Sequence, residues 1–164
     1  MDALSLQLVL PFYEPLSTTE TELDAWCDDV LAPTLEVIGD VPGVHLALHL
    51  GGHLLDHLSR RREALLLDIK RLAKDGHIEI LGGLFYGGVP AMLPELDVRG
   101  QIEMLGEYWE SLTGSAPEGF WLPRLAWCPD LVRLVDDTGL RFGYVGSNQL
   151  VGLDGTVPPL GTLE

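Results

Sequence analysis

Short apolar runs alternate along the chain with stretches in which apolar residues recur every three or four positions. Five such runs predict β-strands, at residues 4–10, 44–50, 77–81, 118–122 and 141–145. The periodicity between them is typical of helices that bury one face. Because alternation of strands and helices favours right-handed βαβ units, we expect an α/β protein with a parallel, barrel-like sheet.

Capping and breaking residues set the expected limits of the helices. Hydroxyl side chains and Glu22 within residues 17–22 predict a capping box at the start of the first helix. Pro33 is expected to kink or end that helix, since proline lacks an N–H group and crowds the preceding turn. Apolar periodicity predicts one continuous helix over residues 54–74, and Gly114 is expected to end the next helix.

Five strands are fewer than the seven or eight that close an α/β barrel. We therefore expect about five βα units of a (β/α)7 barrel, either as an open sheet or as part of a larger domain. Residues 1–164 are expected to form this single, incomplete domain. Residues 147–164 lack helical periodicity and are expected to form a loop-like tail.

The chain has 164 residues and a formal net charge of −15. Such an acidic surface repels phosphate, which argues against nucleic acid or an anionic membrane as a partner. The sequence shows no leader-like segment and no apolar stretch of about 20 residues, so we expect a cytoplasmic protein. Cys27 and Cys128 are expected to be reduced thiols, with a disulfide between them as the alternative. The arginine run 60–62 is expected to face solvent, with binding of an acidic partner protein as the alternative.

Ligands of parallel α/β sheets bind at the carboxyl ends of the strands. The residues near these predicted ends combine aromatic rings with polar groups: Tyr13, Glu14, His49, Tyr86, Trp121, Arg124 and Trp127. Aromatic rings stack on the C–H faces of a sugar while polar groups bond its hydroxyls, so the pattern favours a carbohydrate partner. The alternative is that the rings only cap the core of the barrel.

The histidines and glycines suggest two other kinds of site. Four histidines recur every four residues, the spacing of a metal-binding stripe on a helix: His45, His49, His53 and His57. Gly51 and Gly52 divide them between a strand and a helix, and no third ligand has an obvious spacing. The segment GGLFYGG (82–88) lacks the lysine of a phosphate-binding loop. We therefore expect neither a metal nor a cofactor.

Two long segments resemble a known family. Residues 76–105 (GHIEILGGLFYGGVPAMLPELDVRGQIEML) and 119–145 (GFWLPRLAWCPDLVRLVDDTGLRFGYV) resemble the N-terminal catalytic barrel of glycoside hydrolase family 57. That family contains α-amylases, 4-α-glucanotransferases, branching enzymes and amylopullulanases. The members of the family carry four motifs in a fixed order: HxHQP, H-x-S-G-x-L-L, G-x-x-E-x-L-G-G-x-x-Y-E-P and W-L-P-E-x-x-W. The resemblance extends from about residue 5 to residue 150 and implies a (β/α)7 barrel and an α-glucan or oligosaccharide partner.

The first two motifs are only partly preserved. In LVLPFYEP (8–15), Pro11 and Tyr13 take the places of the family's two histidines, and Glu14 takes the place of a glutamine. In HLGGHLL (49–55), the histidine, a glycine and the leucines are kept. By resemblance, Tyr13, Glu14 and His49 are therefore candidate substrate-binding residues.

The last two motifs differ at functional positions. Tyr86 matches the family, but Gly87 replaces a glutamate that meets substrate there. Trp121 and Trp127 match the last motif, whereas Arg124 takes the place of the catalytic nucleophile. The family's acid/base aspartate belongs to a motif further along than residue 164.

The arginine bears directly on the expected chemistry. Retaining hydrolysis requires two carboxyl groups about 5–5.5 Å apart, one that attacks the anomeric carbon and one that delivers a proton. A guanidinium stays protonated and offers no lone pair, so Arg124 cannot attack. The resemblance thus implies a catalytically impaired chain, a pseudoenzyme. Glu14 is the alternative nucleophile, because Glu118 precedes its strand and should lie at the opposite mouth of the barrel.

Three functions remain open from the sequence. The chain is a portion of an α-glucan hydrolase or glucanotransferase, a non-catalytic α-glucan-binding or regulatory domain, or a structural module. In the last case an exposed barrel edge pairs with another chain, as in a homo-oligomer.

Overall fold

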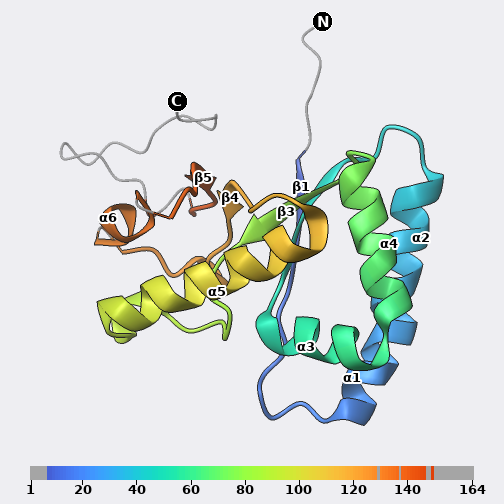
Figure 1. Ribbon diagram of the computed structural model, residues 1–164, viewed down its shortest axis with the longest axis horizontal. Helices are drawn as coiled ribbons and strands as arrows, with labels where there is room; N and C mark the ends of the chain where they lie inside the picture. Colours follow the sequence, from blue (N-terminus) through green and yellow to red (C-terminus); the bar gives the residue numbers. More distant parts are fainter. Residues whose placement is uncertain (1–6, 129, 137, 147–148, 150–164) are drawn as a thin grey trace, which may run out of the picture.

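Five parallel strands form one curled sheet in the computed structural model, which describes residues 7–128, 130–136, 138–146 and 149 (Figure 1). They are β1 (Leu8–Phe12), β2 (Leu46–Leu50), β3 (Ile78–Gly82), β4 (Gly119–Phe120) and β5 (Phe142–Gly143). Each strand pairs in parallel with the next one in the sequence. The predicted partial barrel is therefore confirmed. Apart from residue 149, the expected tail 147–164 lies outside the described residues.

Helices connect the strands and cover one face of the sheet (Figure 1). They are α1 (Glu20–Trp26), α2 (Ala32–Asp40), α3 (Gly52–Arg61), α4 (Glu63–Lys74), α5 (Glu95–Thr113) and α6 (Asp130–Asp136). Three short turns add to them: the π-helical turn η1 (Cys27–Leu31) and the 3-10 turns η2 (Pro90–Met92) and η3 (Pro123–Leu125). In the described part of the chain, no helix is long and apolar enough to cross a membrane.

Two helix ends agree with their sequence signals. The predicted capping box is present at the start of α1, where Thr19 and Glu22 bond each other's backbone N–H groups. Further along the chain, α5 ends at Gly114. The φ of Gly114 is 92°, in the left-handed region that glycine adopts without a Cβ clash.

Strand β2 lies at the centre of the larger core, and all five of its residues are buried. Successive side chains of a strand point to opposite faces. Leu46, Leu48 and Leu50 pack into the main apolar cluster with residues of the helices, including Leu54 and Leu58 of α3. By the same alternation, Ala47 and His49 point to the inner, concave side of the sheet.

A second, smaller core joins α5 and α6 to β4. It contains Phe120 and Leu122 at the end of the sheet, Val98 and Ile102 of α5, and Leu131 of α6. Both cysteines are free thiols. Burial raises the pKa of the Cys27 thiol to about 11, so this thiol is unreactive at neutral pH.

The predicted continuous helix over residues 54–74 is wrong. Helices α3 and α4 meet at Arg62, whose backbone (φ −135°, ψ 40°) is not helical. Both helices pack on the same core, so the apolar spacing continues across the break. The side chain of Arg62 reaches instead to Asp24 of α1, a contact between distant residues that local periodicity does not encode.

The helical segment also does not end at Pro33. The π-helical turn η1 precedes it, closed by a bond from the Ala32 N–H to the Cys27 carbonyl oxygen. Pro33 then lies in the first turn of α2, where a missing N–H costs no hydrogen bond. The extra residue of the π turn therefore lets the helical path continue to Asp40.

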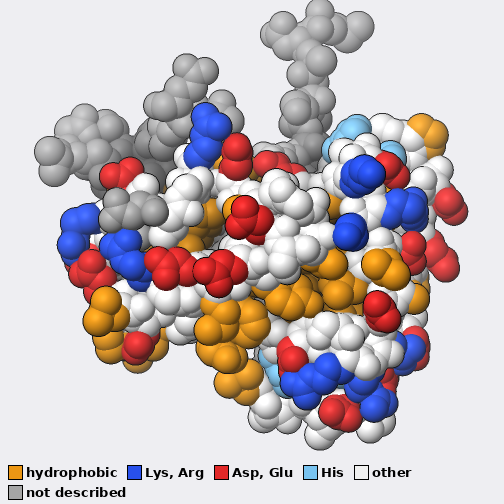
Figure 2. Space-filling view, in the orientation of Figure 1, with side chains coloured by type: hydrophobic (Ala, Val, Ile, Leu, Met, Phe, Trp, Pro, Cys, Tyr) orange, Lys and Arg blue, Asp and Glu red, His pale blue; other side chains and the backbone are white. Residues whose placement is uncertain are grey.

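The arginine run does not simply face solvent, because two of its members bind carboxylates of α1 and η1. Arg61 donates to Asp24 over 2.7 Å, and Arg62 donates to Asp24 over 2.8 Å and to Asp28 over 2.9 Å. The hydrogen bonds from Arg61 and Arg62 hold the pKa of the Asp24 carboxyl well below its usual range. Buried His57 also bonds Asp24, over 3.1 Å. Figure 2 shows basic and acidic side chains interleaved over α1 and α3.

We expect Asp24→Asn to lower the midpoint of chemical denaturation, because the neutral amide leaves two guanidinium groups without their shared counter-ion. The matched control is Asp68→Asn, which removes one exposed partner of Arg71 and should change the unfolding free energy by less than about 0.5 kcal/mol. Urea unfolding followed by circular dichroism checks both variants. Equal small effects of the two substitutions would show that the Asp24 cluster does not stabilise the fold.

Candidate functional site

A cleft of about 200 Å³ lies at the carboxyl ends of the strands. The loops after β1, β3 and β4 enclose it together with the start of α3. Four predicted site residues line it: Tyr13, Glu14, Tyr86 and Arg124. Its lining also includes His53, Phe85 and Val89, which were not among the predicted substrate-binding residues. The strand-end position predicted for a ligand site therefore coincides with a real hollow.

Two glycines allow the walls of the cleft to approach each other. A Cβ atom on Gly52 would lie 2.1 Å from ring carbons of Phe85, and one on Gly51 would lie 3.1 Å from the Cβ of Tyr13. The backbone N–H of Gly52 donates to the Phe85 carbonyl over 2.7 Å, and that of Gly51 donates to the Phe12 carbonyl over 2.8 Å. The loops after β1 and β3 are thus both fastened to the start of α3.

Tyr86 presents an aromatic ring at the cleft. Its side chain is 54% exposed, and its ring packs edge-on against Phe85 at 5.0 Å between centroids. Gln101 of α5 accepts the Tyr86 backbone N–H over 3.0 Å, which fixes the loop. Gly87 follows with φ of 67°, a left-handed conformation that the glutamate of the family motif would adopt at a cost of about 1–2 kcal/mol.

Arg124 enters the cleft from the turn after β4. Its backbone (φ 56°, ψ 18°) is left-handed, and so is that of Leu125 (φ 51°). Such conformations cost non-glycine residues of order 1–3 kcal/mol and cluster at functional sites. The turn holds this geometry through bonds from Leu125 N–H to the Leu122 carbonyl and from Ala126 N–H to the Pro123 carbonyl.

His49 lies beneath the cleft rather than in its lining. It is fully buried, and its Nδ1 contacts the carbonyl oxygens of Leu81 (3.3 Å) and Gly82 (3.1 Å). Burial lowers the pKa of His49 to about 4, against the opposing effect of these carbonyls. The imidazole is therefore neutral at pH 7, with Nδ1–H as donor. Its Nε2 and the Nε1 of Trp121 are both buried without a hydrogen-bond partner among the described residues.

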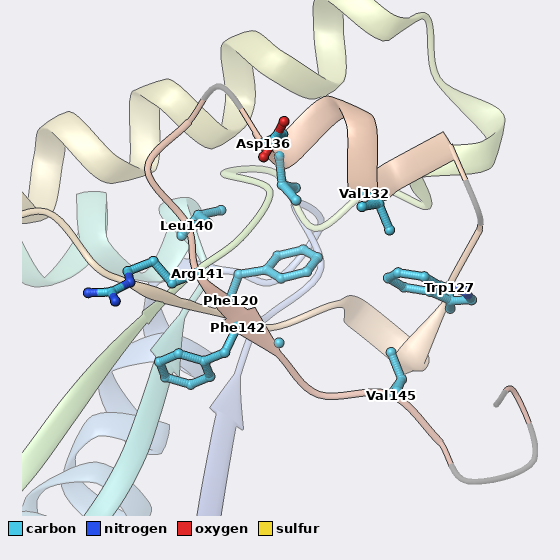
Figure 3. Close-up of a pocket in the computed structure, with 10 residues that line it drawn as sticks. Phe120, Trp127, Val132, Asp136, Leu140, Arg141, Phe142 and Val145 are labelled. Atoms are coloured by element: carbon cyan, nitrogen blue, oxygen red, sulfur yellow. The ribbon is translucent and has the colours of Figure 1, made fainter. Parts of the chain in front are cut away.

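Trp121 and Trp127 do not line the cleft. Trp121 packs near Tyr144, at 6.1 Å between ring centroids. Trp127 lines a separate apolar hollow of about 320 Å³ that also contains Phe120 of β4 and Val132 of α6 (Figure 3). Of the three predicted aromatic site residues in the last two motifs, Tyr86 is thus the one at the cleft.

The remaining candidates lie elsewhere. Glu118 lies at the opposite end of β4 from Arg124, as expected from its position before the strand, and its carboxylate contacts Arg141 at 3.4 Å. His45 bonds the Gly76 carbonyl, and His57 bonds Asp24, so the four regularly spaced histidines have separate environments. The described residues contain no cluster of three or more His, Cys, Asp or Glu side chains that could hold a metal ion.

His53 lines the cleft, although the sequence indicated it only as a helix residue in a possible metal-binding stripe. The structure places it in the first turn of α3, directly after the glycines that end β2. Its Nε2 is buried and has no hydrogen-bond partner among the described residues. The rule that ligands bind beyond the carboxyl ends of strands could have found it, because His53 lies three residues after β2.

The sequence profile of glycosyl hydrolase family 57 matches residues 11–156. The chain belongs to this family. Among family 57 proteins, an alpha-amylase of Pyrococcus abyssi is 28% identical over 133 residues, which are 81% of this chain and 20% of that protein. A 4-alpha-glucanotransferase of Thermococcus litoralis is 32% identical over 113 residues, or 69% of this chain and 17% of its own length.

Solved family 57 structures agree with this assignment. The crystal structure of the Thermococcus litoralis 4-alpha-glucanotransferase superposes with a TM-score of 0.79 at 27% identity, covering 83% of this chain and 21% of that one. A family 57 branching enzyme of Thermococcus kodakaraensis shares the fold, with a TM-score of 0.72 at 16% identity over 88% of this chain and 40% of its own. The chain spans about a fifth of the length of the curated relatives it matches.

We expect His49 to make the stability of this family 57 chain pH-dependent. The pKa of His49 is about 4 in the fold and about 6.5 in an unfolded chain. Between these pH values the unfolded state binds more protons than the folded state. The contribution of His49 to the free energy of unfolding is therefore fully present above about pH 6.5 and is lost as the pH drops toward 4. The loss is on the order of 2–3 kcal/mol.

Denaturant unfolding at several pH values measures this effect. The variant His49→Gln should lose much of the slope between pH 6.5 and 4, whereas the control His45→Gln, which changes an exposed imidazole, should keep it. An unchanged slope in His49→Gln would rule out this histidine as the titrating group.

Proposed function

We propose that this chain provides an α-glucan-binding cleft in which retaining cleavage through residue 124 does not occur. The family assignment and the similarity to alpha-amylases and 4-alpha-glucanotransferases support a glucan as ligand. The position of Arg124, inside the cleft and at the place of the family's nucleophile, is the observation that carries the proposal.

The contents of the cleft suit one end of an oligosaccharide. Its volume of about 200 Å³ is below the ~300–1,000 Å³ usual for sites that enclose a whole drug-sized ligand. The exposed rings of Tyr13 and Tyr86 can stack on a sugar, and the Glu14 carboxylate can accept hydrogen bonds from its hydroxyls. A chain of glucose units would leave the cleft at its open side.

Cleavage with retention needs a nucleophilic carboxylate and a proton donor on opposite sides of the bond. Of the described residues that line the cleft, Glu14 is the one that carries a carboxylate. Arg124 brings a permanent positive charge to the site where the transition state itself becomes positive. This is the wrong sign for catalysis, although it leaves binding of the ground state possible.

We expect the chain to bind maltoheptaose and Tyr86→Ala to weaken this binding by about two- to tenfold, because one stacking ring is worth roughly 0.5–1.5 kcal/mol. Isothermal titration calorimetry measures both affinities. Phe142→Ala is the matched control, since Phe142 is another partly exposed ring, at 40%, that lies outside the cleft. Equal loss of affinity in both variants would contradict binding at the cleft.

A carboxylate returned to position 124 should recover the first covalent step. With α-maltosyl fluoride, the carboxylate oxygen of Arg124→Glu attacks the anomeric carbon while the carbon–fluorine bond breaks and fluoride leaves with the electron pair. Because fluoride needs no proton donor, the step tests residue 124 alone. Intact mass spectrometry should show one added maltosyl group.

The natural chain and the control Arg141→Glu, changed at the opposite end of the sheet, should gain no mass. A maltosyl adduct on the natural chain would overturn the proposed loss of the nucleophile. The absence of an adduct on an Arg124→Glu variant that still binds maltoheptaose would show that residue 124 does not lie at the anomeric carbon.

A further inference from the structure

Arg124 differs from the other arginines of the chain in its charge environment. Each of the other seven has a carboxylate oxygen within 4.0 Å: Arg60, Arg61, Arg62, Arg71, Arg99, Arg133 and Arg141. Among the described residues, none forms an ion pair or side-chain hydrogen bond with the guanidinium of Arg124. Its positive charge faces the cleft without a protein counter-ion.

A shortage of carboxylates does not explain this difference. The chain has 25 acidic and 10 basic residues, so arginines readily find partners on its surface. Glu14 lines the same cleft, yet the two side chains do not form an ion pair. The left-handed backbone of Arg124 also costs free energy, which an unpaired arginine on a loop does not recover within the protein.

His53 lines the same cleft, and one of its ring nitrogens is unsatisfied within the described part of the chain. Its Nε2 is buried and lacks a partner among the described residues, whereas Nε2 of the neighbouring His57 on α3 bonds a carboxylate. An isolated buried polar atom is costly unless a ligand or water bonds it. The first turn of α3 also lines the cleft, and its N-cap, Gly51, offers no side-chain acceptor. The partial positive charge of a helix N-terminus favours a nearby anion.

We infer that the cleft binds an anionic group of its ligand, so that the ligand is an α-glucan carrying a phosphate monoester or a carboxylate. This rests on the proposed glucan-binding function. The planar guanidinium of Arg124 donates two parallel hydrogen bonds to two oxygens of the anion. Glu14 then accepts hydroxyl groups from the uncharged part of the sugar.

Calorimetric titration of the natural chain with four compounds tests this inference. They are maltoheptaose, maltoheptaose with a phosphate monoester at one O6, maltoheptaose with one C6 oxidised to a carboxylate, and inorganic phosphate. We expect at least one anionic sugar to bind about tenfold or more tightly than maltoheptaose, because hydrogen bonds between charged groups are the stronger ones. The preferred anion identifies the source of the charge.

Variants connect the preference to the arginine. Arg124→Gln should remove the preference for the anionic sugar over the neutral one. Arg124→Lys should keep part of this preference, since lysine retains the positive charge but not the paired N–H donors of the guanidinium. The control Arg133→Gln, which changes an exposed arginine paired with Glu95, should leave the ratio unchanged. Circular dichroism confirms that each variant is folded.

The possible outcomes separate this inference from the proposed function. Equal affinities for the neutral and anionic sugars, or a preference that survives Arg124→Gln, overturn the inference and leave glucan binding in place. Phosphate binding that needs Arg124, without binding of any sugar, supports the anion site and overturns the glucan function. If no compound binds, both are wrong.

Discussion

The burial of β2 on both of its faces is the constraint on which the rest of this structure depends. Its leucines pack against α3 and the other helices on one side, and His49 is fully buried on the other. Parallel pairing with β1 and β3 then fixes the register of three strands at once. Because their carboxyl ends lie at the same edge, the loops that follow them are held side by side, and the cleft forms where they meet.

The close approach of Gly51 and Gly52 to the neighbouring loops converts this edge into a cleft. With a side chain at Gly52, the Phe85 ring could not lie where it does, and the loop that carries Tyr86 would have to move. Gly52, which is kept from the family motif, and Gly51 therefore have a packing role at the cleft. The glycines that shape the cleft are different residues from Arg124, so the geometry of the cleft does not depend on the residue at position 124.

The cleft differs from the rest of the protein surface in its charge, because Arg124 brings to it a positive charge that is unpaired among the described residues. In an acidic protein, most basic side chains are neutralised locally, as Arg61 and Arg62 are by Asp24. Arg124 lies in a left-handed turn after β4, and no carboxylate of the described residues pairs with its guanidinium. A guanidinium at this position attracts negative charge.

The sequence by itself determined the parallel partial barrel, a capping box within residues 17–22 and the positions of Tyr13, Glu14, Tyr86 and Arg124 near the strand ends. These features follow from periodicity and from residues that are neighbours in the chain. Only the tertiary structure decided that α3 and α4 separate at Arg62, that Trp127 lies in a second hollow and that His53 joins Arg124 in the cleft. Each of these depends on contacts between segments far apart in the sequence, and a local pattern of apolar and polar residues carries no information about which distant side chains will meet.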